Sequence, residues 1–249
     1  QANIRGGSGY SYGAGSRVML LMDDIPVLTA DAGFPNWDFL PIENLEQVEI
    51  VKGASSALYG SSAMNGIINL RTAYPKSTPE GKITFFTGMY QNPSNNEVIR
   101  YNADGTPLDT VKKSWWGGAY PIETGASFAY RRKFNQFDLV TGGYFFNETG
   151  WRRPDYGRLG RINANMRYRF KDVPGLSIGL NTNLQKNTSA SFLIWDRNNA
   201  PSSDEGAYLL YTALPPINNV GLKATIDPFV EYFSASGFKV KLLGRYYKK

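Results

Sequence analysis

Two segments in the second half of the chain alternate between apolar and polar residues along their whole length. In residues 161–171 (RINANMRYRFK) an apolar residue occupies every second position, and arginine, asparagine or lysine occupies the positions between. Residues 175–185 repeat the pattern, with leucine and isoleucine against serine, asparagine and glutamine. Because successive side chains of a β-strand point to opposite faces, both segments are predicted to be strands with one apolar and one polar face.

Weaker alternation predicts five further strands, at residues 83–90, 125–132, 136–146, 223–233 and 238–247. The predicted strands are about ten or eleven residues long, which is the length of a tilted strand that crosses a bilayer. A soluble β-sandwich also contains alternating strands, so the strand pattern alone leaves that fold open.

The connections between these strands alternate in length. The long or medium ones are residues 91–121, 148–158 and 187–221, and the tight ones are residues 134–135, 172–175 and 234–237. An up-and-down membrane barrel has tight turns on one side and longer loops on the other. A sandwich gives no reason for connections to be sorted in this way, so the loop lengths favour an antiparallel membrane β-barrel.

The first 75 residues have a different pattern. Residues 17–22 form a continuous apolar run, which predicts a strand buried on both faces and ended by the turn at 23–26. Residues 45–51 and 66–72 predict two more strands, and residues 54–58 predict a short helix. A compact α+β arrangement is therefore expected before the barrel strands.

The composition excludes several kinds of site. Among the 249 residues there is no cysteine and no histidine. Disulfides, cysteine-based zinc or redox sites, histidine-metal sites and Ser-His-Asp catalysis are therefore ruled out. We predict no enzyme activity, no metal site and no cofactor. The net charge of +6 comes from basic residues interleaved with apolar ones, so nucleic-acid binding is not predicted.

The ends of the chain and its strand count predict that it is an internal piece of a longer protein. No run of about 18 apolar residues occurs, so no transmembrane helix is predicted. The first residues, QANIR, contain neither an initiator methionine nor the features of a signal peptide. About seven strands are predicted, whereas single-chain bacterial barrels have even numbers of strands.

Residues 42–72 (IENLEQVEIVKGASSALYGSSAMNGIINLRT) resemble the C-terminal plug signature of the TonB-dependent outer-membrane receptors. That pattern runs roughly IE-x-IEV-x-RGP-SS-x-LYG-x-x-A-x-GG-x-INI-x-T. Upstream, an Arg-Gly pair and the segment VMLLMDDIPV resemble the preceding plug motif, an IRG followed by a "lvliDGvpv" strand. The residues that carry the signature are Arg5, Gly6, Glu49, Lys52, Gly53, Ser56, Leu58, Tyr59, Gly60, Gly66 and Asn69. We expect them to hold the plug folded and docked.

The sequence departs from the family pattern at three places. Lys52 replaces the usual arginine, no proline follows Gly53, and Asn65 replaces the second glycine of the GG pair. In the family the arginine often pairs with barrel carboxylates, and a lysine cannot form the same planar bidentate contact. Asn65 resembles the Bacteroidetes style of receptor, but the KDAS-type sequence of SusC-like glycan importers is replaced by KGASS. A SusD-like surface lipoprotein partner is therefore possible but is not indicated by the sequence.

The resemblance implies an architecture and a mechanism without covalent chemistry. Residues 1–75 would be the C-terminal part of a plug inside the lumen of an outer-membrane barrel of 22 strands. Residues 76–249 would be about the first seven barrel strands, surrounded by outer-membrane lipid, with extracellular loops at 91–121, 148–158 and 187–221.

The implied function is active uptake of a scarce solute. The candidate solutes are a ferric siderophore, cobalamin, an oligosaccharide and a peptide. The TonB–ExbB–ExbD complex would energise uptake through a segment upstream of this chain. The alternative is a non-transporting surface receptor or a scaffold subunit of an outer-membrane complex with the same fold.

Two groups of residues are candidates for solute contacts, because aromatic rings beside amide and carboxylate groups suit a sugar-like or chelate-like ligand. They are Asp31, Phe34, Asn36, Trp37 and Asp38 in the apical plug loop, and Trp115 and Trp116 in the first long loop. The same aromatic residues also fit packing of the plug against the barrel or anchoring at the membrane interface.

The polar strand faces are expected to line the lumen, with the basic residues Arg161, Arg167, Arg169 and Lys171. These cations would either attract an anionic solute or pair with plug acids such as Glu46 and Glu49.

Overall fold

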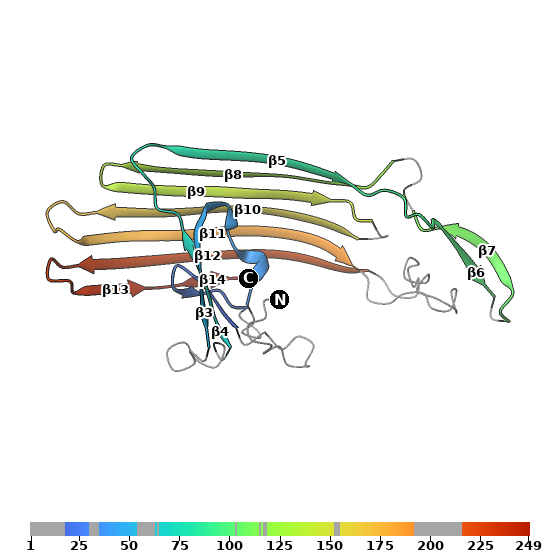
Figure 1. Ribbon diagram of the computed structural model, residues 1–249, viewed down its shortest axis with the longest axis horizontal. Coiled ribbons are helices and arrows are strands. Elements are labelled where there is room, and N and C mark those ends of the chain that lie inside the picture. The colour runs from blue at the N-terminus through green and yellow to red at the C-terminus, as the bar shows by residue number, and fades with distance from the viewer. Residues whose placement is uncertain are drawn as a thin grey trace.

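The computed structural model describes residues 18–29, 35–53, 63, 65–102, 104–114, 116, 119–151, 155–191 and 216–249. The described strands form a small sheet, a large sheet and a separate two-stranded hairpin (Figure 1). Two short 3-10 helices, η1 (Trp37–Phe39) and η2 (Ile42–Asn44), lie along the chain between the second and third strands of the small sheet. Neither of these described helices is long and apolar enough to cross a membrane.

The large sheet is antiparallel throughout, and its neighbouring strands follow one another along the chain. Its members are β5 (Glu80–Met89), β8 (Ile122–Phe134), β9 (Phe137–Glu148), β10 (Tyr156–Arg169), β11 (Leu176–Ser191), β12 (Ile217–Phe233), β13 (Lys239–Leu243) and β14 (Tyr246–Lys248). All seven predicted strands are confirmed. The last one is interrupted at residues 244–245, so that β13 and β14 both pair with β12. Several strands are longer than predicted, up to 17 residues in β12.

The predicted alternation of connections is also confirmed. The tight turns after β8, β10 and β12 lie at one end of the sheet, and the longer connections lie at the other end (Figure 1). The connection from β5 to β8 contains a hairpin that was not predicted, formed by β6 (Glu97–Tyr101) and β7 (Pro107–Lys112). Its strands are five and six residues long, too short for a clear alternating pattern.

The small sheet contains β1 (Val18–Met22), β2 (Ile25–Pro26), β3 (Leu45–Lys52) and β4 (Gly66–Thr72), in the order β2-β1-β4-β3. Strand β1 is parallel to β4 and buried on both faces, as the continuous apolar run predicts. Its side chains divide between two apolar clusters, one with Val18 and Leu20 and one with Met19 and Leu21. The predicted helix at 54–58 lies outside the described residues.

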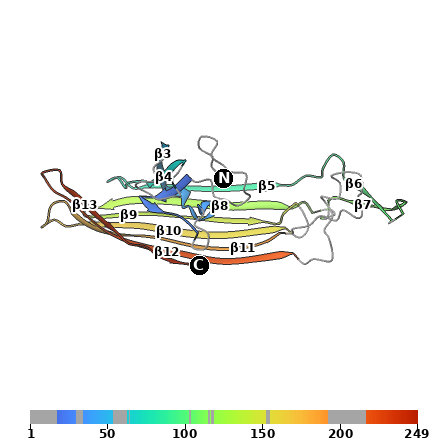
Figure 2. The ribbon, with the colours of Figure 1, turned by 90° about the horizontal axis from the view of Figure 1, so that it is seen from below.

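The large sheet has its polar residues covered and its apolar residues exposed. On one face Gln185 is 1% exposed and Arg161 is 5% exposed, while on the other face Ile162 is 51% and Val220 is 73% exposed. The small sheet lies against the polar face, which is the concave one (Figure 2). We call this the inner face and the apolar side the outer face. This is the reverse of a soluble sheet, which buries its apolar side.

Candidate functional site

The contact between the two sheets is polar, and nearly all of its described hydrogen bonds are donated by the large sheet. Side chains of the large sheet donate hydrogen bonds, and groups on the small sheet and its helices accept them. For example, the Asn183 amide donates to the Phe39 carbonyl over 2.7 Å, and Lys223 Nζ donates to Asn36 Oδ1 over 3.1 Å. One described contact runs the other way, from Asn44 Nδ2 to Asn163 Oδ1. The inner face therefore presents cations and amides to carboxylates and carbonyls.

The most buried ion pair in this contact joins Glu43 and Arg161. Glu43 belongs to η2 and Arg161 to the middle of β10, and their side chains are 3% and 6% exposed. The other Glu43 carboxylate oxygen accepts a hydrogen bond from Asn163 Nδ2 over 3.3 Å. Arg161 also donates to the Asp38 carbonyl and lies 5.5 Å from the Tyr144 ring centroid. Because both charges are out of water, either one would be costly to leave without its partner.

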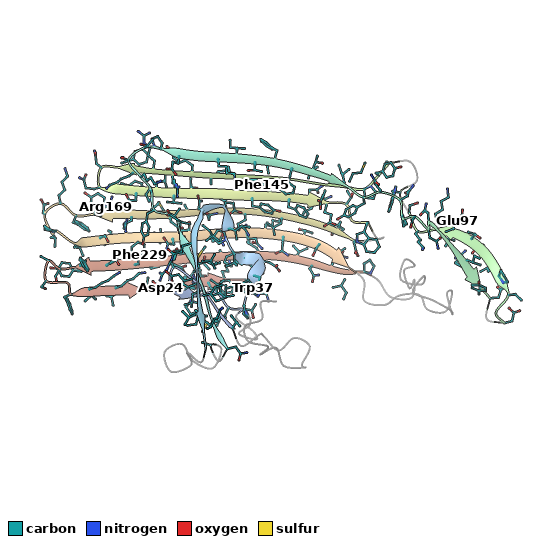
Figure 3. All side chains as sticks on the ribbon, viewed as in Figure 1. Asp24, Trp37, Glu97, Phe145, Arg169 and Phe229 are labelled. Carbon is teal, nitrogen blue, oxygen red and sulfur yellow. The ribbon has the colours of Figure 1, made fainter. Side chains whose placement is uncertain are left out.

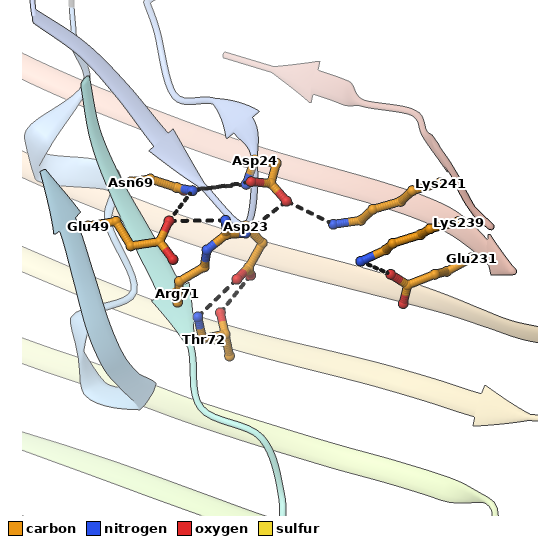
Figure 4. Close-up of polar contacts among 9 residues, drawn as sticks. All are labelled: Asp23, Asp24, Glu49, Asn69, Arg71, Thr72, Glu231, Lys239 and Lys241. Atoms are coloured by element: carbon orange, nitrogen blue, oxygen red, sulfur yellow. Dashed lines mark hydrogen bonds and ion pairs between the residues drawn. The ribbon is translucent and has the colours of Figure 1, made fainter. Parts of the chain in front are cut away.

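A second contact forms at the turn between β1 and β2 (Figure 4). Asp23 and Asp24 have φ angles of 50° and 74°, as a two-residue type I′ hairpin turn requires. The family motif has glycine where this chain has Asp24. The substitution forces a side chain into the left-handed region, but it places a carboxylate where Arg71 and Lys241 reach it over 2.8 and 3.1 Å.

The charges around Asp24 hold it ionised. Burial raises the pKa of Asp24, but hydrogen bonds and charge from Arg71 and Lys241 outweigh burial and lower it from 3.8 to about 2. Lys241 belongs to β13, so this carboxylate connects the small sheet to the large one (Figure 4). Asn69 donates to both Asp24 and Glu49, which assigns this signature residue a structural role.

The expected pairing between inner-face cations and plug acids is found, but Arg161, Arg167 and Arg169 pair with acids other than Glu46 and Glu49. Arg161 pairs with Glu43, which was not among the expected acids. Glu49 instead pairs with Arg71 inside the small sheet, and Glu46 lies 3.9 Å from Arg131. The cations Arg167 and Arg169 both pair with Asp138 on β9, because the strand register places Asp138 directly opposite Arg167.

The candidate solute contacts of the apical loop lie at the contact between the sheets. Asn36 is buried, and Trp37 packs against the core of the small sheet (Figure 3). The Asp38 side chain is exposed, although its carbonyl accepts a hydrogen bond from Arg161. Trp116 is half-buried in the first long connection. Asp31, Phe34 and Trp115 lie outside the described residues, so solute binding by this set stays a prediction.

Of the described signature residues, Lys52, Gly53 and Gly66 lie at strand ends, whereas Glu49 and Asn69 are register partners in the middle of β3 and β4. Gly53 and Gly66 have φ angles of 120° and 150°, which supports the prediction that glycine is needed there for backbone conformation. Lys52 is exposed at the end of β3. The signature residues Arg5, Gly6, Ser56, Leu58, Tyr59 and Gly60 lie outside the described residues.

The structure also brings together an aromatic group that the sequence did not indicate. Phe86 on β5 stacks on Tyr144 and Phe146 of β9, with centroid separations of 6.2 and 6.3 Å. Gly125 on β8 lies between these strands, and a Cβ there would come within 2.2 Å of the Phe86 ring. We call these three rings the ring cluster. It lies on the inner face and extends from Tyr144, the register partner of Arg161, toward the loops.

Two carboxylates flank the ring cluster toward the loops. Glu123 and Glu148 are register partners on β8 and β9, and Tyr90 donates a hydrogen bond to Glu148. Sequence reasoning missed this group because aromatic residues point to both faces of β9, which hides the alternation. The pairing of Gly125 with both Phe86 and Phe146 is visible after the strand register is known.

Residues 1–67 match the family model of the TonB-dependent receptor plug domain. This match indicates a TonB-dependent receptor. Among curated relatives, the vitamin B12 transporter BtuB of Photobacterium profundum is 31% identical over 132 residues, which cover 52% of this chain and 20% of that protein. The ferric enterobactin receptor PirA of Pseudomonas aeruginosa is 33% identical over 70 residues, which cover 28% of this chain and 9% of that receptor. The chain thus spans about a fifth or less of these relatives.

Solved receptors share the fold. The siderophore receptor PirA of Acinetobacter baumannii superposes with a TM-score of 0.60 at 14% identity, covering 93% of this chain and 32% of that one. A variant of the ferric enterobactin receptor PfeA of Pseudomonas aeruginosa, solved with enterobactin, gives a TM-score of 0.57 at 12% identity, covering 93% and 33%. The arrangement of a small sheet against an antiparallel large sheet is therefore the fold of these receptors, which decides against the soluble sandwich.

Proposed function

We propose that this protein takes up a scarce solute across the outer membrane through a plugged β-barrel energised by TonB. The observation that carries the proposal is the inverted polarity of the large sheet. Its outer face is apolar and exposed, as a lipid-facing wall requires, while its polar inner face is occupied by the small sheet. In this proposal the small sheet closes the lumen, and the barrel lies in the outer membrane as a multi-pass structure.

We further propose that the large sheet is the first part of a closed barrel of 22 strands. Among the described residues, β5 pairs on one side only, and so do β13 and β14 at the other edge. An open edge exposes unpaired backbone groups, which lipid cannot satisfy, so further strands must close the sheet. The plug would comprise residues 1–75 and the first barrel strands residues 76–249, with the loops at 91–121, 148–158 and 187–221 facing outside.

The named relatives suggest the kind of solute. They include a vitamin B12 transporter and a ferric enterobactin receptor, so cobalamin and ferric siderophores come first, with oligosaccharides and peptides as further candidates. We propose that the solute contacts the ring cluster together with the exposed Asp38 and the half-buried Trp116. Arg161, Arg167, Arg169 and Lys241 are already engaged by Glu43, Asp138 and Asp24, so attraction of an anionic solute by those four cations is not proposed.

Energy from the TonB–ExbB–ExbD complex would be needed because the small sheet is held by buried charges. Breaking the pair between Glu43 and Arg161 leaves an uncompensated buried charge, at a cost of about 3–5 kcal/mol. A polar contact of this kind keeps the barrel closed at rest, and its hydrogen bonds can be exchanged for water once a pulled plug segment begins to open a path.

The test is uptake by cells that carry the complete gene, with the same strain lacking that gene or lacking TonB as controls. Radiolabelled cobalamin, a ferric siderophore, an oligosaccharide and a peptide are supplied one at a time. We expect one of them to accumulate, and both deletions to abolish its accumulation. If no solute depends on the gene and loss of TonB has no effect, uptake is refuted and the non-transporting receptor or scaffold becomes the better account.

A further inference from the structure

The carboxylates of the large sheet differ in whether a cation neutralises them. Because the registers of β5 and β8 to β12 run without a bulge, register partners of Arg161 share its inward direction, and the carboxylates of these strands all point inward with it. Those on the tight-turn side of Arg161 form ion pairs with neighbouring cations. The pairs are Glu80 with Arg131, Asp138 with Arg167 and Arg169, Asp227 with Arg245, and Glu231 with Lys239 (Figure 4).

Glu123 and Glu148, on the loop side of Arg161, are not neutralised in this way. No basic side chain of the described residues lies within ion-pair distance of either carboxylate. The two residues lie directly opposite each other on β8 and β9, where Cβ atoms are about 4.5–5.5 Å apart and like charges repel. Both side chains are half-buried, so water screens their repulsion only in part. Tyr90 donates a hydrogen bond to Glu148, which leaves the negative charge in place.

The surrounding inner face supplies no cation to this pair. Toward the loops from Arg161, the inward positions of β5 and β8 to β12 hold aromatic, aliphatic, amide, hydroxyl and glycine residues besides the two carboxylates. The nearest inward cations of these described strands lie at the level of Arg161 itself. Arg161 is engaged by Glu43, and Lys223 donates to Asn36. Within the described strands, the loop side of the inner face is therefore negatively charged.

The ring cluster borders the two carboxylates. Phe146 lies two residues from Glu148 on β9, and Gly125, over which the Phe86 ring lies, is two residues from Glu123 on β8. The planes of the three rings differ by only 13–24°, and Phe86 is 37% exposed. Nearly parallel rings offer an apolar surface whose faces also attract cations. An apolar surface and an uncompensated negative charge thus lie side by side.

We propose that Glu123 and Glu148 bind a primary ammonium group of the transported solute, while the ring cluster contacts an apolar part beside that group. This inference rests on the proposed uptake function and specifies the charge of the solute. An ammonium has three donors, so one group bridges two facing carboxylates and removes their repulsion. The required chemistry, an ammonium beside an apolar face, occurs in amine-bearing ferric chelates, in amino sugars and in lysine peptides.

The experiment measures equilibrium binding to the complete receptor, purified in a mild detergent. The probes are three matched pairs, each with a free amine in one member and the same amine acetylated in the other. They are a ferric trihydroxamate, a glucosamine oligomer and a short lysine peptide. We expect the ammonium form of one class to bind at least tenfold more tightly than its acetylated form, and this preference to shrink as salt screens the charges. The class that shows the preference identifies the source of the amine.

Variants of the two carboxylates test the assignment. Glu123→Gln and Glu148→Gln should each reduce the preference for the ammonium form, and the double variant should abolish it, because glutamine keeps the shape of the side chain and removes its charge. The matched control is Glu231→Gln. It removes an inward carboxylate that Lys239 already neutralises, so the wild-type preference should remain. Heat-modifiable migration of each variant verifies that the barrel has folded.

Three results would overturn the proposal. No ammonium form binds more tightly than its acetylated partner, the double variant keeps the preference, or the control loses it to the same extent. TonB-dependent uptake is measured separately in cells that carry the same variants. Uptake of a solute without an ammonium group, unchanged in the double variant, refutes this inference alone. Preferential binding of an ammonium form without any TonB-dependent uptake refutes the proposed function alone.

Discussion

Replacing Glu43 by glutamine tests how strongly the small sheet is held against the large one. The Glu43 and Arg161 side chains are 3% and 6% exposed, so neither charge is solvated if the other is removed. Loss of one partner of a buried ion pair costs about 3–5 kcal/mol. Glutamine keeps one acceptor oxygen for Arg161, so we take the lower end, about 3 kcal/mol. With tenfold per 1.4 kcal/mol, opening of the small sheet should become about 100-fold more frequent.

Amide hydrogen exchange on the complete receptor measures this opening. We expect peptides that cover η2, β3 and β4 to exchange about 100-fold faster in Glu43→Gln, while peptides from β9 to β11 keep the wild-type rate because the wall itself is unchanged. Arg161→Gln should have a similar effect. The double variant should recover most of the loss, because a neutral pair replaces an unpaired buried charge.

The matched control is Glu46→Gln. The Glu46 side chain is 50% exposed and 3.9 Å from Arg131, so this pair is worth at most about 1 kcal/mol and its loss should change exchange by less than about fivefold. The reasoning fails if Glu43→Gln exchanges within twofold of the wild type. It also fails if the two variants have equal effects, since burial of the pair would then not determine its strength.

Three further predictions follow from other parts of the structure. Arg71 and Lys241 lower the pKa of Asp24 to about 2, so the stabilising contribution of Asp24 should persist above pH 4 and be lost as the pH falls from about 4 to 2. Hydrogen exchange of β1 and β2 should show this loss in the wild type and not in Asp24→Asn. Asparagine is chosen because it tolerates positive φ. Leu184→Arg, on the outer face at the middle of β11, should cost about 2–4 kcal/mol and reduce barrel assembly in the outer membrane. Thr188→Arg near the loop end should cost no more than about 1 kcal/mol, and equal assembly of the two variants would contradict a lipid-facing sheet. Phe86→Ala should weaken binding of the transported solute by at least fivefold, measured by equilibrium binding to the complete receptor, while leaving assembly unchanged; unchanged affinity would remove the ring cluster from the proposed binding surface.

The strands and their order along the chain could be predicted from the amino-acid sequence alone. The alternation of apolar and polar residues can be read within a single strand, because successive side chains of a strand point to opposite faces whatever the strand packs against. All seven large-sheet strands and the three longer small-sheet strands were therefore predictable, as was the sorting of tight and long connections. The plug signature identified the family from order and spacing within one continuous stretch, which the family model matches at residues 1–67.

The contacts between distant residues could be found only in the folded structure. Arg161 and Glu43 are separated by 118 positions, and no local rule distinguishes Glu43 from Glu46 or Glu49 as the partner. The choice depends on how η2 approaches β10. The ring cluster needs Gly125 to lie between Phe86 and Phe146, which is set by the pairing of three strands. Strand formation is governed by local periodicity, but contacts between strands depend on register and on the docking of the two sheets, and these are properties of the whole fold.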